Sequence, residues 1–301
     1  MPVEIPFRRD FEFAYGKLEP VAPGVRRIIA RNPGPFTFRG TGTYVVGEGE
    51  VAVIDPGPDL PEHVEALVQA LAGERVTHIL VTHTHRDHSP AAAPLKVATG
   101  APTYGFGPHA GGKRGETGSE EGGDWDFVPD VVVRDGDQIT GAGWRFEAVH
   151  TPGHTSNHLC FALPDQGILF SGDHVMGWST SVIAPPDGDM ASYMAALDKL
   201  LSRGDRVYWP THGPAITEPK AHVRAFIAHR REREEGIRVC LAAEIGHIDQ
   251  IVARLYAGLQ PGLRGAAGRS VLAHLIDLVA RGEVVCDGPP TIDAYYRLAR
   301  G

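Results

Sequence analysis

The stretch Ile79–His88, ILVTHTHRDH, places four side chains that can bind a metal directly after a short apolar run. The apolar run predicts a buried strand, so His83, His85, Asp87 and His88 follow its end. Strand ends are where ligand sites collect in α/β proteins. Imidazole and carboxylate are ligands that zinc accepts, and catalytic zinc sites keep one position open for water. This stretch therefore predicts a metal site, and a solvated polar loop is the weaker interpretation.

Three further candidate ligands follow runs that are typical of strands. They are His154 in Thr151–Thr155 (TPGHT), Asp173 in Ser171–Asp173 (SGD) and His212 in Pro210–Gly213 (PTHG). Neutral imidazole and carboxylate again suit a borderline-soft dication such as zinc. The repetition favours one metal centre assembled from several strand ends.

In this order, the segments resemble the signature of metallo-β-lactamase-fold hydrolases over about residues 20 to 217. Asn32–Pro35 (NPGP) and Gly40–Tyr44 (GTGTY) make the chain most similar to the lactamase-beta-like 2 group, which are zinc-dependent, endoribonuclease-type proteins with a C-terminal winged helix. The resemblance implies an α/β fold, namely an αββα sandwich with a small C-terminal winged-helix module.

The resemblance also implies the roles of the ligands. His83, His85 and His154 would hold one zinc, Asp87, His88 and His212 a second, and Asp173 would bridge both. Two metals about 3.5 to 4 Å apart would activate a bridging hydroxide as nucleophile, with Asp87 as the catalytic residue that orients it. Ligation by nitrogen and oxygen also tolerates iron or manganese. Asp55 in Val53–Gly57 (VIDPG) would support the metal loop as an acceptor for a ligand imidazole; an Asx turn before Pro56 is the alternative.

Composition predicts a globular chain in a reducing compartment. The 301 residues, 42% of them hydrophobic, suffice for one large or two moderate domains. Cys160, Cys240 and Cys286 are odd in number and widely scattered, which argues against a disulfide framework. The first residues lack an apolar signal segment, and no run of eighteen apolar residues occurs. We therefore expect a cytoplasmic protein without membrane contact.

The net charge of −8 is unevenly distributed. Residues 218–301 carry 12 Lys and Arg against 10 Asp and Glu, so the first 217 residues carry a net −10. Strong duplex binders usually show a clear basic patch. This distribution disfavours nucleic acid, although two bound dications would reverse the local field at the metal site.

Punctuated apolar runs predict the elements around the ligands. We expect strands at 25–31, 43–46, 51–55, 102–106, 131–134, 144–150, 158–163, 167–170 and 207–209, and helices at 61–71, 91–99 and 190–201. Ser89 and Asp189 are the expected N-caps of the last two helices, and Tyr193 is expected to pack in the core. The Gly-rich segment 107–126 lacks periodicity and predicts a mobile rim of the cleft, in which His109 is a bystander.

The composition changes after residue 217. We expect a catalytic domain at 1–217, a connecting helix at 218–243 whose charged stretch His229–Glu235 is mostly solvated, and a winged-helix module at 244–301. Helices at 247–256 and 270–280 and strands at 282–286 and 295–298 would form the module. It could bind nucleic acid or form a homodimer interface, and its small charge favours the interface.

Three functions remain open, with the substrate-binding residues unknown. The first is a di-metal hydrolase of single-stranded RNA, which the resemblance supports. The second is a hydrolase of a thioester or small acyl ester of the glyoxalase II-like type, which suits the charge better. The third is a non-enzymatic, metal-stabilised interaction scaffold. Beta-lactam hydrolysis is disfavoured because no cysteine occupies a ligand position, and the 38 residues between Asp173 and His212 leave no room for a β-CASP insertion.

Overall fold

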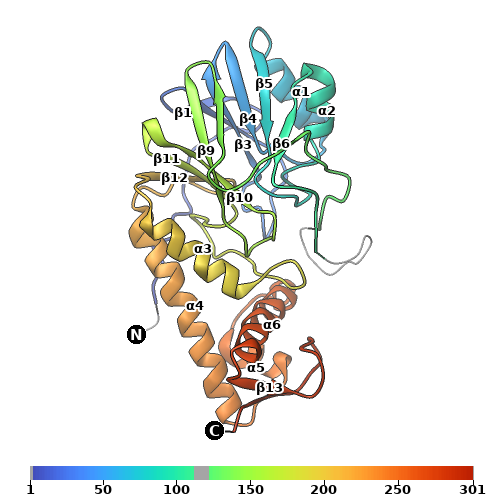
Figure 1. Cartoon of the computed structure of the whole chain (residues 1–301), viewed down its shortest axis with the longest axis vertical. Coiled ribbons are helices and arrows are strands. Elements are labelled where there is room, and N and C mark those ends of the chain that lie inside the picture. Colours follow the sequence, from blue (N-terminus) through green and yellow to red (C-terminus); the bar gives the residue numbers. More distant parts are fainter. Residues whose placement is uncertain (1–2, 112–121, 301) are drawn as a thin grey trace.

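Two β-sheets form the upper part of the molecule (Figure 1), and the computed structural model describes residues 3–111 and 122–300. The first sheet has the strand order β1-β2-β3-β4-β5-β6-β7. Strands β1 to β4 pair antiparallel, whereas β4 to β7 pair parallel. The strands are β1 Glu19–Ala22, β2 Val25–Ile29, β3 Gly42–Glu48, β4 Glu50–Ile54, β5 Arg75–Leu80, β6 Thr103–Gly105 and β7 Val131–Val132.

The second sheet has the order β12-β11-β10-β9-β8. Only β11 and β12 are parallel neighbours; the other pairs are antiparallel. Its strands are β8 Gln138–Gly141, β9 Trp144–His150, β10 Leu159–Leu163, β11 Ile168–Gly172 and β12 Val207–Pro210. Because β9, β11 and β12 run in one direction, their carboxyl ends lie at the same edge of the sheet.

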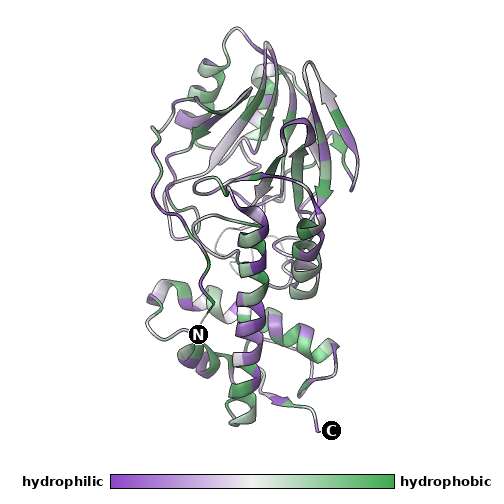
Figure 2. Ribbon diagram, turned by 90° about the vertical axis from the view of Figure 1, so that its left-hand side faces the viewer, coloured by the Kyte–Doolittle hydropathy of each residue, from purple (hydrophilic) through white to green (hydrophobic). Residues whose placement is uncertain are grey.

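Apolar side chains fill three layers of this sandwich. Tyr44 of the first sheet packs with Phe146 and Phe170 of the second between the two sheets. Helices α1 (Pro61–Ala70) and α2 (Ala92–Thr99) cover the outer face of the first sheet, and α3 (Met190–Ser202) and α4 (Pro219–Ala242) cover that of the second. The strands of the sandwich carry long hydrophobic stretches (Figure 2). The predicted αββα arrangement is confirmed.

A small module with its own core lies below the sandwich (Figure 1). It contains α5 (Ile248–Leu255), the short helix η2 (Pro261–Leu263), α6 (Arg264–Ala280) and a hairpin of β13 (Val284–Cys286) and β14 (Tyr296–Leu298). The predicted winged-helix module is therefore present. Helix α6 begins six residues before the expected Ser270, and Gly268 in these added turns lies buried near Ile248 and Ile292.

The charged stretch His229–Glu235 in α4 is not mostly solvated, which corrects our expectation. Arg230 is buried, donates a hydrogen bond to the carbonyl of Ser181 and lies over the ring of Tyr193. Arg233 donates to the carbonyl of Leu255 in α5 at 2.9 Å. Long arginine side chains thus connect α4 to the sandwich and to the module.

Several other expectations can be compared with the structure. Asp189 caps α3 by accepting from the backbone N–H of Ser192. Ser89 does not cap α2, because this helix begins at Ala92 with Ala91 as its N-cap; the Ser89 hydroxyl donates to Asp124 at 2.6 Å. The three cysteines form no disulfide. No helix in the described ranges is long and apolar enough to cross a membrane. Residues 112–121 of the predicted mobile rim lie outside the described residues.

Candidate metal centre

Every predicted ligand follows the carboxyl end of a strand, and these ends meet at one edge of the sandwich. His83 to His88 follow β5, His154 follows β9, Asp173 follows β11 and His212 follows β12. Backbone bonds join the two sheets here: Leu159 N–H donates to Thr82 O at 2.7 Å, and Gly42 N–H donates to Thr211 O at 2.9 Å. The loops that carry the ligands are therefore fixed to one another.

Three histidines form the first group of candidate ligands. Nε2 of His83 lies 2.9 Å from Nδ1 of His85, and Nε2 of His154 lies 3.1 Å from the same atom. Three nitrogens at zinc-bond distances of about 2.0–2.1 Å in a tetrahedral arrangement lie about 3.3 Å apart. All three side chains are buried, and their spacing is that of a three-nitrogen metal site.

Asp87, His88 and His212 form the second group, and Asp173 lies beside it. Oδ2 of Asp87 is 3.0 Å from Nε2 of His212 and 3.4 Å from Nε2 of His88. Oδ2 of Asp173 is 3.3 Å and 3.5 Å from the same two nitrogens. Ligand atoms of Asp173, His88 and His83 also lie within 4.8 Å of one another. The Asp173 carboxylate thus lies between the two groups.

The donor atoms fit a metal. Oδ1 of Asp87, Oδ1 of Asp173 and Nε2 of His88 are buried and have no hydrogen-bond partner among the described residues. A buried polar atom without a partner costs about 1–3 kcal/mol, and more when it is charged. A cation would bind the lone pairs of Asp173 and His88, and a water beside it could donate a hydrogen bond to Oδ1 of Asp87. The set of imidazole nitrogens and carboxylate oxygens suits zinc and also tolerates iron or manganese.

Hydrogen bonds on the far side of four imidazoles aim their Nε2 atoms at the site. Each Nδ1–H faces an acceptor, which fixes the tautomer. The pairs are His83 with Thr82 Oγ1 at 3.1 Å, His88 with Asp55 Oδ2 at 2.9 Å, His154 with Val182 O at 2.6 Å and His212 with Gly40 O at 3.2 Å. The histidines are therefore oriented before a metal binds.

Asp55 holds several of these segments together. Besides His88, its carboxylate accepts from the backbone N–H of Thr82 at 2.8 Å, the Thr82 hydroxyl at 2.7 Å and the Thr211 hydroxyl at 2.9 Å. Its backbone has a φ of 48°, a region that residues other than glycine rarely adopt. These contacts favour the supporting role over an Asx turn before Pro56.

Opposite charges inside the site shift its pKa values in opposite directions. Burial disfavours charge on His212, but Asp173 and Asp87 outweigh burial and raise the pKa of His212 to about 10. The same balance of burial against Asp87 and Asp173 raises the pKa of His88 well above its ordinary value. Burial opposes ionisation of Asp87 and Asp173, yet the histidines hold both pKa values well below the usual range. Protons therefore compete with a metal for these nitrogens, and binding should weaken at low pH.

Two buried histidines beside the ligands were missed in the sequence. Nε2 of His158 accepts a hydrogen bond from the backbone N–H of Asp173 at 3.2 Å, and its Nδ1 donates to Thr151 at 2.9 Å. His174 is fully buried against the ring of Tyr193. Their nearness to His154 and Asp173 in sequence was the available signal, but the expected strand at 158–163 explained His158 without any further role.

The sequence singled out two other residues, Tyr193 and His109. The Tyr193 side chain is buried, and its hydroxyl donates to the carbonyl of His174 at 3.0 Å. Nδ1 of His109 lies 3.0 Å from the hydroxyl of Thr84, and its ring centroid is 6.4 Å from that of His85. His109 thus lies beside the candidate ligands and is in none of the three ligand groups of the described residues.

Comparison with known families agrees with this architecture. Residues 37–212 match the metallo-beta-lactamase superfamily, and residues 248–289 match the beta-lactamase associated winged helix domain. A beta-lactamase domain protein from Burkholderia ambifaria superposes with a TM-score of 0.80 at 22% identity, covering 98% of this chain and 97% of that protein. The similarity to this solved structure supports the fold alone.

Two curated relatives are also similar in sequence. The lactamase-like protein nscB of Neosartorya fischeri is 33% identical over 263 residues, which are 85% of this chain and 70% of nscB. The atrochrysone carboxyl ACP thioesterase of Cryptosporiopsis sp. is 30% identical over 223 residues, or 73% of this chain. The match spans 63% of that thioesterase's own length.

Proposed function

We propose that this chain, which belongs to the metallo-beta-lactamase superfamily and is a metal-dependent hydrolase, acts on thioesters. The similarity to an ACP thioesterase over 73% of this chain carries the proposal. The cluster of histidines and aspartates supplies a site where such a hydrolysis can take place. The acidic first 217 residues also suit a small acyl substrate better than a polyanion.

The residues of the site would have different roles in hydrolysis. We expect the site to bind two divalent cations, with zinc as the first choice of metal. When bound, they would polarise the thioester carbonyl and lower the pKa of a water molecule. His83, His85 and His154 would hold one, Asp87, His88 and His212 the other, and Asp173 both. Asp87 is 13% exposed and Asp173 only 1%, so Asp87 lies nearer to the side from which water enters.

Asp87 is therefore our candidate catalytic residue. Its Oδ2 is held by His212 and by the Thr41 hydroxyl at 3.3 Å, whereas Oδ1 has no partner among the described residues. Oδ1 can accept a hydrogen bond from the attacking water. This bond would orient a lone pair of the water oxygen toward the carbonyl carbon of the thioester. The bond from carbon to sulfur then breaks, and the proton from the water goes to the thiolate that leaves.

Cleavage of single-stranded RNA is the second candidate. The winged-helix module favours it, because such modules bind nucleic acid in many proteins. The charge of the chain opposes it, since residues 244–301 of the module carry six acidic and six basic residues. We rank it below thioester hydrolysis.

A side-by-side turnover assay separates the candidates. Metal-loaded protein would be given an acyl thioester, a single-stranded RNA, a chromogenic phosphodiester and a beta-lactam at equal concentration. We expect the highest kcat/KM on the thioester, and loss of that activity after chelation. RNA turnover with a blank-level thioester rate would replace our proposal with the second candidate.

A further inference from the structure

Phe38 and Trp178 form a stacked pair of aromatic rings, which we call the aromatic pair. Their ring centroids are 4.7 Å apart, and their planes differ by 13°. Both residues are half-buried. Because Nε1 of Trp178 is itself buried, the surface that this indole exposes is apolar. Ligand sites are lined mainly by apolar and aromatic side chains, and neither ring has a role in the metal centre.

The loop that carries Phe38 is bound to the more exposed side of the metal centre. Asn32, at the start of this loop, accepts from the backbone N–H of Thr41 and donates to the Thr41 hydroxyl, both at 2.9 Å. This hydroxyl in turn donates to Oδ2 of Asp87 at 3.3 Å, and the Asp87 side chain is 13% exposed. Because consecutive Cα atoms are about 3.8 Å apart, Phe38 lies within about 11 Å of Thr41. Phe38 is therefore a neighbour of the Asp87 side of the site.

The conformation of Phe38 is fixed by its own loop. Its backbone has a φ of 57°, which is rare for a bulky residue. Its N–H donates to Gly34 O at 2.9 Å, and Gly34 N–H donates to Phe38 O at 3.3 Å. Residues held in such a backbone conformation are concentrated at functional sites. The ring is therefore held in place without a bound ligand.

Trp178 packs against the segment that carries the candidate ligand His212. A Cβ at Gly213 would lie 3.1 Å from Cδ1 of Trp178, and a Cβ at Gly177 would lie 2.7 Å from Pro214 O. The two segments thus approach each other more closely than larger residues at these glycines would allow. The indole therefore lies directly against the residue that follows a ligand.

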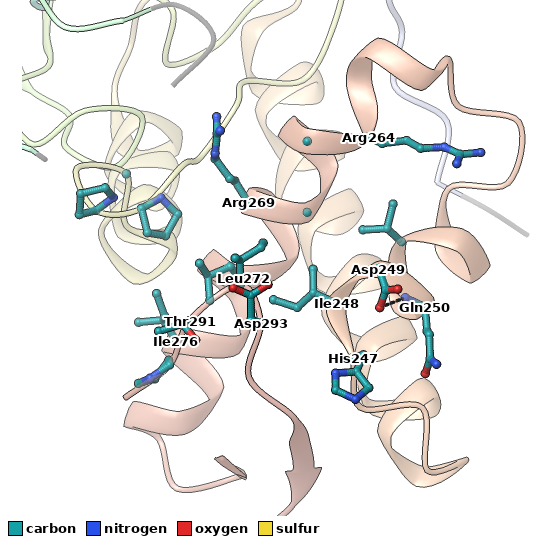
Figure 3. A pocket seen from close by; sticks show the side chains of 18 of the residues that line it. His247, Ile248, Asp249, Gln250, Arg264, Arg269, Leu272, Ile276, Thr291 and Asp293 are labelled. Carbon is teal, nitrogen blue, oxygen red and sulfur yellow. Dashed lines mark hydrogen bonds between the residues drawn. The ribbon is translucent and has the colours of Figure 1, made fainter. Parts of the chain in front are cut away.

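The groove between the C-terminal module and a loop of the sandwich lies elsewhere. It has a volume of about 1310 Å³, and its labelled side chains all belong to the module (Figure 3). Among the described residues that line it are neither Phe38 nor Trp178 nor any of the candidate metal ligands. The groove is therefore separate from the metal centre, whereas the aromatic pair adjoins it.

We propose that Phe38 and Trp178 bind the acyl group of the substrate and favour planar, aromatic acyl groups. The inference rests on the proposed thioester hydrolysis. The aromatic pair adjoins Asp87, beside which the carbonyl carbon would be attacked. A planar ring can stack on an aromatic side chain over its whole face, whereas a flexible alkyl chain must also be ordered when it binds.

The test compares acyl groups on one small carrier, with full-length, metal-loaded protein. The acetyl, hexanoyl, benzoyl and 2-naphthoyl thioesters of N-acetylcysteamine would be the substrates. Trp178→Ala removes the indole, Trp178→Phe keeps a ring, and Phe38→Leu replaces the other ring by an apolar side chain. Tyr295→Ala, which changes an exposed aromatic residue of the C-terminal module, is the control. Thermal midpoints would verify that each variant is folded.

Binding would be measured separately from turnover. The ligand would be the naphthyl thioether of N-acetylcysteamine, in which a CH₂ group replaces the carbonyl, so that it is not hydrolysed. Its affinity for the wild-type protein and for each variant would be obtained by calorimetry.

We expect wild-type protein to show its highest kcat/KM on the naphthoyl thioester. Trp178→Ala should raise KM for this substrate about tenfold, because stacking and buried apolar area are both lost. Its kcat, and its KM for the acetyl thioester, should match those of Tyr295→Ala. Phe38→Leu should act in the same direction, Trp178→Phe should restore most of the loss, and affinity for the thioether should follow the KM values.

Two results would overturn the inference. One is an equal KM for the naphthoyl thioester in wild type, Trp178→Ala and Phe38→Leu, together with equal thioether affinity. The other is a wild-type preference for the hexanoyl over the naphthoyl thioester, which would contradict the selection of planar groups. If wild-type protein hydrolyses none of the four thioesters, the proposed function fails, while calorimetry with the thioether still tests the aromatic pair.

Discussion

Oδ2 of Asp55 lies 2.9 Å from Nδ1 of His88, so a carboxylate at the end of β4 orients an imidazole in the loop after β5. Both side chains are buried. The same carboxylate oxygen accepts from the hydroxyls of Thr82 and Thr211. One buried oxygen therefore fixes the segments that lead to His83 and to His212.

Asp55→Asn should weaken metal binding. The amide keeps the size of the side chain but loses the charge that stabilises the His88 N–H, and loss of such a partner typically costs about 10- to 100-fold in metal affinity. Zinc affinity would be measured by competition with a chromogenic chelator. Asp59→Asn, at an exposed position in the following loop, is the matched control. Equal zinc affinity in the two variants would contradict the supporting role of Asp55.

Asp87→Asn should reduce turnover far more than it reduces stability. Asparagine keeps the shape but lowers the ligand's charge and replaces an accepting oxygen by a donor at one position. Loss of a preorganised group at a reacting centre costs about 10² to 10³ in kcat. We would measure kcat, bound metal and thermal midpoint together, with metal in excess. Near wild-type turnover in the metal-replete variant would show that Asp87 is structural.

Arg230→Met should destabilise the protein by about 1–3 kcal/mol. The buried guanidinium donates to Ser181 O, and methionine leaves that carbonyl without its charged donor. Arg231→Met changes the exposed neighbour in the same helix and should stay within about 0.5 kcal/mol of wild type. Denaturant unfolding of both variants in chelator would test the difference. Equal denaturation midpoints of the two variants would show that the apolar side chains of α4, and not Arg230, hold this helix in place.

His274 should make the module sensitive to acid. Burial, followed by Arg230, His229 and Arg281, lowers the pKa of His274 well below its ordinary 6.5. Both ring nitrogens lack a hydrogen-bond partner among the described residues, and the nearest carboxylate oxygen, Oε2 of Glu234, lies 4.0 Å from Nδ1. The unfolded chain therefore binds this proton at a higher pH than the folded chain. Stability is full above about pH 6.5 and falls as the pH decreases toward the folded pKa.

His274→Leu should reduce the loss of folding stability that occurs as the pH falls below about 6.5. Unfolding would be followed at pH 7.5 and pH 5 in the presence of chelator, which removes the contribution of bound metal. The variant should lose less stability between the two pH values than wild type and than His247→Leu, which changes an exposed histidine of the same module. An identical loss in all three proteins would show that His274 is not the group that titrates.

The candidate ligands could be predicted because each one lies next to its own strand. A local apolar run followed by His or Asp places the residue at a strand end, and parallel strand directions bring the ends together. The support for Asp173 could not be predicted in this way. His158 reaches it only because β10 lies between β9 and β11, and no local pattern encodes that neighbour.

The same reasoning explains the differences in the C-terminal part. Glycine is unfavourable inside helices. Because of Gly265 and Gly268, the sequence did not predict the first turns of α6 as helical. The structure accepts Gly268 because Ile248 and Ile292 pack against that position. Arg230 was predicted to be solvated from the charges around it, but α3 and Tyr193 cover it in the folded chain. In both cases a tertiary contact overrides a local preference.

Titration of metal-free protein with zinc, while thioester hydrolysis and bound metal are recorded together, tests the central claim most directly. The two groups of ligands with Asp173 between them predict that turnover rises with zinc, reaches its maximum near two bound equivalents and disappears on chelation. Full thioester turnover in protein without metal, or none at saturating zinc, would contradict the assignment of this site to thioester hydrolysis.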